Sequence, residues 1–158
     1  MMRDQNTLWK QSSVCTTPDG LVKVTATSRC LGTVSPVSFA TPSTPLEPKQ
    51  RFAYRIRVEN VSWDTTVQLL GRYWHIAEEE ENNNADDDDD DGDGGGDGSP
   101  TSLEPIEVDA PYTGAVGQLP VLQPGQVFEY VSGTDLATPV GTMKGHFYMA
   151  TVPSKTRS

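Results

Sequence analysis

The residues best suited to binding a ligand lie in a short loop that contains two glycines. Gly114 and Gly117 are three positions apart in the stretch Tyr112-Thr113-Gly114-Ala115-Val116-Gly117, and backbone N–H groups in glycine-rich loops can bind phosphate. A dinucleotide-binding fingerprint also needs a helix directly after the loop. Pro120 follows Gly117 within three residues, so no helix is expected there. Two interpretations remain: a phosphate or pyrophosphate site, and a tight structural loop whose glycines adopt positive φ.

A run of aspartates is the second candidate, as a site for a divalent cation. Asp87, Asp89, Asp91 and Gly92 match the first half of an EF-hand loop. The twelfth position of that loop would be Gly98, where a bidentate glutamate is required. A specific calcium site is therefore not expected. The run is interpreted either as a solvated low-complexity segment or as an acidic arm that docks on a basic partner.

The sequence offers no set of residues for catalysis. His75 and His146 are the only histidines, and neither has a cysteine or carboxylate at zinc-ligand spacing. No serine lies in a nucleophile elbow. Cys15 and Cys30 are too few for a disulfide scaffold and are expected to be reduced thiols. We therefore expect a protein that is not an enzyme, with no catalytic residues, no cofactor and no metal centre.

The net charge of −10 arises from one segment. Residues 78–97 contain 12 of the 22 acidic residues and no basic residue, which leaves 10 acids against 12 Lys and Arg in the rest of the chain. A body with a formal charge of +2 gives no electrostatic case for nucleic acid binding. No apolar run is long enough to cross a membrane, and the first ten residues lack the apolar core of a secretory signal. An intracellular protein, cytoplasmic or mitochondrial, is expected.

The candidate residues must be positioned by strands, and the most informative strand is Thr66–Ile76. After Gly71, the apolar residues Trp74 and Ile76 lie at even positions and share one face of the strand. Before Gly71, the apolar residues Val67 and Leu69 lie at odd positions. Because alternation has a period of two, this change of parity predicts a bulge at Leu70-Gly71. The same pattern predicts that Trp74 points into the core, with the His75 side chain on the opposite, less buried face.

Residues 52–60 form the clearest alternating strand, with four large apolar side chains on one face and charged side chains on the other. This strand is expected to form a hairpin-like pair with Thr66–Ile76. No helix longer than a turn is predicted, so the fold class is all-β, a two-sheet antiparallel sandwich or a barrel. Further strands are expected at residues 21–27, 104–108, 127–132 and 144–152.

Composition divides the chain into one domain and three peripheral segments. Residues 1–20 lack periodicity and are predicted to be a flexible extension. The domain spans residues 21–152 and is interrupted by an acidic insert at residues 78–100, which has nothing to bury and is predicted to be disordered. Residues 153–158 are predicted to be a tail.

Five sequence blocks stand out: Val-Gln-Leu-Leu-Gly-Arg-Tyr-Trp at 67–74, Gly-Ala-Val-Gly-Gln-Leu-Pro at 114–120, Leu-Gln-Pro-Gly at 122–125, Phe-Glu-Tyr-Val-Ser-Gly at 128–133 and Thr-Pro-Val-Gly-Thr-Met-Lys-Gly-His-Phe-Tyr-Met at 138–149. In their order and spacing, these blocks resemble the ApaG domain. The resemblance implies an immunoglobulin-like or fibronectin type III-like sandwich of two antiparallel sheets. It also implies an association with cobalt resistance and magnesium efflux in bacterial relatives. Eukaryotic relatives carry the domain beside an F-box or in a DNA-polymerase-interacting protein, where it looks like a partner-binding module.

The sequence departs from the family pattern in three ways. The acidic insert interrupts a strand pair just before the glycine loop. Tyr112 stands where the family's Gly-x-Gly-x-x-Gly motif has its first glycine. The sequence also stops soon after Val152, where relatives continue into a further strand, so an open sheet edge is expected there unless the N-terminal residues supply a substitute. An open edge is either an aggregation hazard or a docking surface.

These observations predict a non-enzymatic protein-interaction module, alone or within a larger assembly. The partner, an unidentified protein, is expected to contact the sheet edge near the carboxyl terminus and the Tyr112–Gln118 loop. The alternative is a small-ligand domain for pyrophosphate, a nucleotide, or a divalent cation such as cobalt or magnesium. The candidate binding residues are Arg72, Tyr112, Gly114, Gly117 and Gln118.

Overall fold

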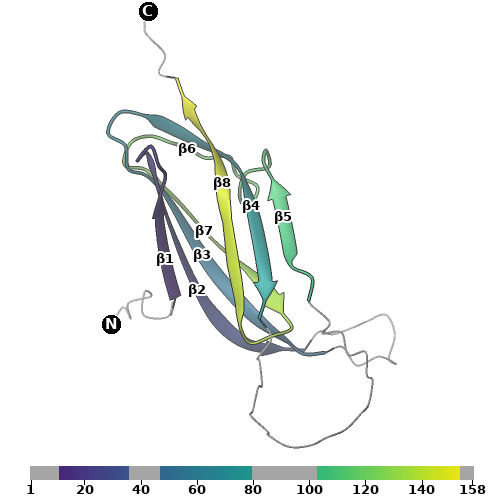
Figure 1. Ribbon diagram of the computed structural model, residues 1–158. Coiled ribbons are helices and arrows are strands. Elements are labelled where there is room, and N and C mark those ends of the chain that lie inside the picture. Colours follow the sequence, from purple (N-terminus) through teal and green to yellow (C-terminus); the bar gives the residue numbers. More distant parts are fainter. Residues whose placement is uncertain (1–10, 36–46, 80–102, 154–158) are drawn as a thin grey trace, which may run out of the picture.

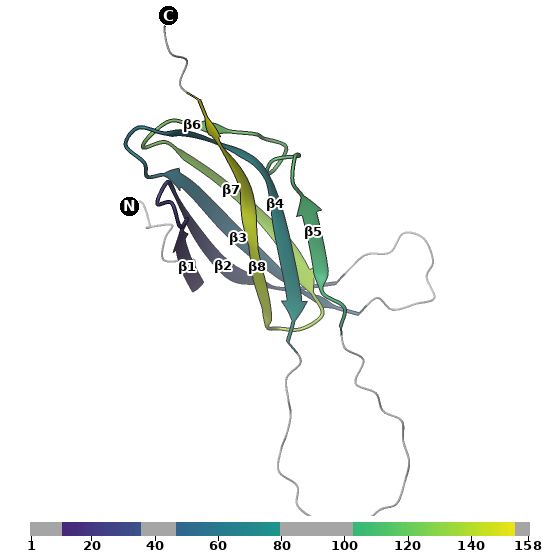
Figure 2. The ribbon, with the colours of Figure 1, turned by 45° about the horizontal axis from the view of Figure 1, so that its top comes forward.

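The computed structural model describes residues 11–35, 47–79 and 103–153, and every regular element in these ranges is a β-strand. The eight strands form two antiparallel sheets packed face to face, as Figures 1 and 2 show from two directions. The predicted all-β sandwich is therefore confirmed. No helix in the described residues is long and apolar enough to cross a membrane.

Sheet A has four antiparallel strands in the order β1-β2-β3-β7. In sheet B, β4 pairs with β8 along its whole length, and β5 and β6 pair with separate parts of β4. Because a strand has only two sides, β5 and β6 share the side of β4 that β8 leaves free. Sheet A is thus four strands across and sheet B three. The strands are β1 (Gln11–Thr16), β2 (Val22–Val34), β3 (Lys49–Asn60), β4 (Thr66–Glu78), β5 (Ile106–Ala110), β6 (Val121–Leu122), β7 (Val127–Leu136) and β8 (Gly141–Val152).

The core lies between the inner faces of β3 and β4. Ile56 and Val58 of β3 and Leu69 of β4 are fully buried, and Trp74 is 7% exposed. The Trp74 ring packs edge-on against the ring of Phe147, with centroids 5.4 Å apart. Burying each such side chain contributes about 1.5–3 kcal/mol before entropy is subtracted. The predicted burial of Trp74 is confirmed.

A bulge in β4 changes which residues face the core. Leu69 pairs with Met149 and Gly71 with Tyr148, so Leu70 has no counterpart on β8. The bulge predicted from the apolar parity is therefore confirmed. A side chain at Gly71 would overlap the backbone of Ala110, which explains why a glycine is needed there.

The predicted hairpin between β3 and β4 is wrong. The two strands lie in different sheets, and the residues between them carry the chain from sheet A to sheet B. Asn60 anchors this crossing, because its buried amide donates to the carbonyls of Thr65 (2.7 Å) and Leu122 (2.9 Å), and its Oδ1 accepts from the Ser62 hydroxyl (2.6 Å). Turn composition marked the connection correctly, but composition does not specify which sheet the chain enters next.

The predicted N-terminal extension also needs correction, because residues 11–16 form strand β1. All six residues are exposed, and within the described ranges β1 pairs only with β2. The strand was missed because its sequence, Gln-Ser-Ser-Val-Cys-Thr, has no apolar alternation. The acidic insert falls largely outside the described residues, as do residues 1–10 and 154–158. The strands that flank the insert, β4 and β5, are antiparallel neighbours.

Candidate functional site

One side of the sandwich is sealed by the connection between β5 and β6. The Gly114 amide donates to the Leu70 carbonyl at the β4 bulge (2.8 Å), and the Arg72 guanidinium donates to the Gly114 carbonyl (2.6 Å). Ala115 is fully buried in the core cluster. The bulge, the arginine and the loop therefore form one unit that closes this side.

Backbone hydrogen bonds engage three of the loop's amides, those of Gly114, Ala115 and Gln118. Ala115 and Gln118 exchange two backbone hydrogen bonds, both 2.9 Å long. Gly114 and Gly117 have φ values of 69° and 74°, and between them Val116 has φ 47°, which is strained for a β-branched residue. A side chain at Gly114 would overlap the Gln118 carbonyl, whereas the space beside Gly117 is open. The loop geometry fits a structural plug better than a phosphate cradle.

The five predicted site residues are only partly gathered together. Arg72 and Gly114 are in direct contact, and Gln118 joins them through the backbone of Ala115. Gly117 lies within the same loop. Tyr112 is 78% exposed and contributes nothing to the core.

Behind the loop, the sandwich interior contains polar atoms of two aromatic residues. The Trp74 indole N–H and the Tyr130 hydroxyl are buried without a hydrogen-bond partner in the described residues. Burial raises the pKa of Tyr130 far above its ordinary value. Tyr130 is therefore a neutral phenol at physiological pH.

The opposite side of the sandwich is open. Among the described residues, β1 pairs only with β2, and β8 pairs only with β4. In both Figure 1 and Figure 2, β1 lies at the left of the molecule and β5 at the right, and β8 lies between β1 and β4. The structure therefore has a free edge on each sheet along the same side.

A groove of about 290 Å³ opens between these two edges. β1 and β8 form its rims, and β3, β4 and β7 contribute apolar side chains to its floor. No lining residue is charged. The lining residues are Gln11, Ser12, Ser13, Ala26, Thr27, Ser28, Phe52, Ala53, Tyr54, Ile76, Thr134, Leu136, Gly141, Thr142 and Met143.

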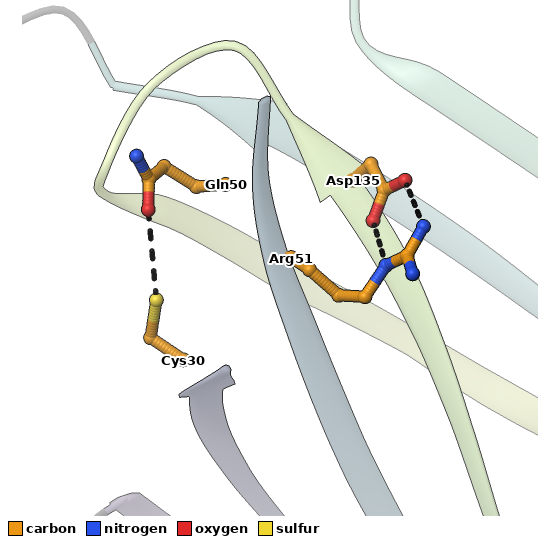
Figure 3. A network of polar contacts seen from close by, with 4 residues as sticks. All are labelled: Cys30, Gln50, Arg51 and Asp135. Carbon is orange, nitrogen blue, oxygen red and sulfur yellow. Dashed lines mark hydrogen bonds and ion pairs between the residues drawn. The ribbon is translucent and has the colours of Figure 1, made fainter. Parts of the chain in front are cut away.

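Side-chain contacts fix sheet A at the end where the groove opens (Figure 3). Arg51 of β3 donates from Nε and Nη2 to the two carboxylate oxygens of Asp135 on β7, at 2.8 and 2.9 Å. The hydrogen bond from this guanidinium lowers the pKa of Asp135 below its ordinary value. Nearby, the Cys30 thiol lies 3.9 Å from Oε1 of Gln50. The Arg51–Asp135 contact links β3 to β7 beside the groove residue Leu136, and the Cys30–Gln50 contact links β2 to β3.

The outer face of sheet B carries both histidines in a polar cluster. His75 Nδ1 lies 3.3 Å from Glu107 Oε1, and the Tyr73 hydroxyl donates to the same oxygen (3.1 Å). These contacts lower the pKa of Glu107, with the His75 contact the largest cause. The ring of Tyr73 stacks on His146, with centroids 5.2 Å apart. In the described ranges, no group of three His, Cys, Asp or Glu side chains is arranged to hold a metal ion.

The groove residues were missed because they come from six strands and share no local motif. The one sequence signal was indirect: an open sheet edge was expected near Val152. β1, which forms one rim, carried no strand signal at all. The sequence thus predicted an open edge near Val152, but it did not predict the groove.

The fold defines an immunoglobulin-like or fibronectin type III-like β-sandwich of two antiparallel sheets. Residues 40–94 and 106–151 match the family model of the ApaG domain. The chain belongs to the ApaG family.

Curated relatives and solved structures agree with this assignment. The chain is 36% identical over 119 residues to the protein ApaG of Rhodospirillum centenum, covering 75% of this chain and 72% of that protein. It is 35% identical over 113 residues to the protein ApaG of Pectobacterium atrosepticum, covering 72% and 70%. A crystal structure described as an ApaA protein from Bordetella pertussis superposes with a TM-score of 0.53 at 27% identity, covering 82% of this chain and 79% of that one.

Proposed function

We propose that this chain is a non-enzymatic protein-interaction domain, alone or within a larger assembly, that binds an extended segment of a partner along strand β8. One observation carries the proposal: β8, from Gly141 to Val152, is hydrogen-bonded on one side only in the described structure. A partner strand that adds to this edge would gain backbone hydrogen bonds along its length, which is a recurrent mode of peptide recognition.

The composition of β8 supports this use of its edge. Natural edge strands are usually protected by charges, prolines or bulges. Lys144 is the only lysine, arginine or acidic residue in β8, and the strand has no proline. By comparison, β5 places two acidic residues within five positions, Glu107 and Asp109. Of the two edges of sheet B, β8 is thus the one less protected against pairing.

The proposal is tested by selecting binders from a displayed library of extended peptides and mapping them by backbone NMR on the labelled chain. We expect the largest shift changes within Gly141–Val152. Strand β7 is the internal control, because it is also an edge strand but lies on the other side of the sandwich. Changes concentrated in β7 or in the Tyr112–Gln118 loop would contradict the proposal.

A second candidate function, binding of a small anion or a divalent cation, has one observation in its favour. Val116 is held at positive φ between Gly114 and Gly117, and backbone strain of this kind clusters at binding sites. Thermal unfolding with pyrophosphate, nucleotides, magnesium or cobalt separates the two functions, since a ligand of the native state raises the midpoint by mass action. A rise with any of these probes, lost in Val116→Gly, would favour this second function.

An intracellular setting, cytoplasmic or mitochondrial, is part of the proposal. Cys15 and Cys30 are both free and exposed, which suits a reducing compartment. Neither membrane nor nucleic acid is included among the proposed partners.

A further inference from the structure

We infer that the outer face of sheet B binds a basic segment of a partner protein in which two arginines are separated by one residue. Each arginine pairs with one carboxylate of β5, Glu107 or Asp109, beside a tyrosine ring. These carboxylates lie on the opposite side of β4 from β8 (Figure 1). The inference therefore goes beyond the proposed function and holds whether or not a strand pairs with β8.

The strand register places two carboxylates on the solvent side of sheet B. Glu107 pairs with His75, and Asp109 pairs with Tyr73. The two β4 residues flank Trp74, whose side chain is buried in the core, so the acidic side chains point to the outer face. Both acidic residues are exposed. Because residues two apart on a strand lie about 6.8 Å from each other, the face presents two negative charges at the repeat of an extended chain.

Tyrosine hydroxyls orient both carboxylates. The Tyr73 hydroxyl donates to Glu107 Oε1 (3.1 Å), and the hydroxyl of Tyr148 on β8 donates to Asp109 Oδ1 (3.0 Å). These hydrogen bonds are the largest cause that raises the pKa of both tyrosines, so the hydroxyls stay protonated as donors. In the described part of the chain, Glu107 Oε2 and Asp109 Oδ2 make no hydrogen bond. One oxygen of each carboxylate is therefore left to accept from a ligand.

The aromatic rings on this face favour a guanidinium over an ammonium. The His146 ring stacks on Tyr73, with centroids 5.2 Å apart, and meets Tyr148 edge-on at 4.9 Å. Since each tyrosine hydroxyl is bonded to a carboxylate, a cation on that carboxylate lies next to a tyrosine ring. A guanidinium is planar, binds a carboxylate through two N–H groups and stacks on aromatic rings, whereas an ammonium is a compact point charge.

The charge around the face complements a basic segment. Lys144 is the one lysine or arginine that strand pairing places on the outer face of sheet B in the described strands, and His75 separates it from Glu107. Residues 78–97, with 12 acidic residues and no basic one, begin at the last residue of β4 and precede β5. Negative charge joined to these two strands raises the local concentration of a cationic segment.

Three short peptides test the inference on the full chain. Acetyl-Thr-Arg-Thr-Arg-Thr-amide has the inferred spacing, acetyl-Thr-Arg-Arg-Thr-Thr-amide has the same composition with adjacent arginines, and the third peptide replaces both arginines of the first by lysine. NMR titration gives the dissociation constants and the side chains that shift. We expect the first peptide to bind about threefold more tightly than the other two, with the largest changes at Tyr73 and Tyr148. Equal affinities, no binding, or changes confined to residues 80–100 would overturn the inference.

Paired variants locate the bound peptide. Glu107→Gln should weaken binding of the Arg-Thr-Arg peptide about threefold. Glu129→Gln is the matched control, because Glu129 is an exposed glutamate on a strand of sheet A, and it should leave the affinity unchanged. Equal losses in the two variants would overturn the assignment to the outer face of sheet B.

Tyr73→Phe tests whether the hydroxyl acts through the carboxylate. The variant keeps the ring and removes the hydrogen bond to Glu107. It should weaken binding about twofold in the otherwise unchanged chain and have no effect in Glu107→Gln, because no carboxylate is then left to orient. Equal effects in both backgrounds would overturn the positioning role of Tyr73.

Six Asp→Asn substitutions at residues 86–91 test the acidic segment separately. They should weaken all three peptides alike, about two- to fivefold at low ionic strength, and leave the preference for the Arg-Thr-Arg spacing intact. Loss of that preference would show that the acidic segment selects the peptide, and it would overturn the inference.

Discussion

The two sides of the sandwich close in different ways. On the β5–β6 side, the loop around Gly114 bonds to the β4 bulge and to Arg72 and inserts Ala115 into the core. On the other side, β1 and β8 end as unpaired edges with an uncharged groove between them. The residues with a recognisable motif thus build the closed side, whereas the open side has the geometry to receive a partner. A glycine motif can be required for packing without forming a binding site.

The largest expected loss of stability is at Gly114. Comparison with Gly117 separates the cost of steric overlap from the cost of positive φ. Gly114→Ala should lower the free energy of unfolding by about 3 kcal/mol, because its side chain would overlap the Gln118 carbonyl and adopt positive φ. Gly117→Ala has a similar φ but open space, so it should lose only about 1 kcal/mol. Chemical denaturation of both variants gives the two values.

This pair of variants also tests the structural interpretation of the motif. If the two alanine variants lose equal stability, the loop does not pack as described. If neither loses stability but either loses binding of pyrophosphate, the motif is a ligand site.

The second-largest expected loss of stability is at Arg72, whose side chain joins the loop to β4. Arg72→Met keeps the length of the side chain but removes the hydrogen bond to the Gly114 carbonyl. We expect a loss of about 2 kcal/mol in denaturant unfolding, typical of a partly buried charged donor. A loss below about 0.5 kcal/mol would mean that the arginine is free for another role, such as holding an anion.

Much of the fold could be predicted from local patterns, because sandwich strands alternate between core and solvent. The alternation of residues 52–60 and the parity change at Gly71 located β3, β4 and the bulge. The pairing of β3 with β4 was predicted wrongly, since it depends on where Asn60 anchors the crossing, and a buried side-chain network has no sequence period. β1 was missed because a strand exposed on both faces carries no apolar signal.

The candidate site was less predictable than the fold. Arg72 and Gly114 were identified from the motif, and they do lie together, in a packing role. The groove depends on the relative widths of the two sheets, which follow from topology and not from any single segment. Leu136 and Met143 lie outside the predicted strands 127–132 and 144–152, and they become strand residues that line the groove only once both sheets are assembled.

Replacing Val116 is expected to change the free energy of unfolding by a smaller amount and to raise it. Its φ of 47° is unfavourable for a β-branched side chain, and its side chain is 48% exposed. Val116→Gly should therefore raise the free energy of unfolding by about 1 kcal/mol, measured by chemical denaturation. Destabilisation instead would mean that the valine side chain contributes packing that outweighs the strain.

The smallest expected effect on stability comes from the ion pair between Arg51 and Asp135, beside the groove. The pKa of Asp135 is lowered by Arg51, so this pair stabilises the fold fully above the carboxyl's unfolded pKa, about pH 4. The contribution is lost as the pH falls through the lower, folded pKa. Asp135→Asn should remove this part of the acid dependence of stability. An NMR titration in which the Asp135 carboxyl has an ordinary midpoint would contradict the pairing.

Amide hydrogen exchange along β8 tests the open edge most directly. In an antiparallel edge strand, alternate N–H groups face the neighbouring strand and the others face solvent. In the free chain, protection across Gly141–Val152 should therefore alternate, and a selected peptide should slow the fast-exchanging set by about tenfold or more. Uniform protection of every β8 amide in the free chain would show that the edge is already covered and would contradict the account.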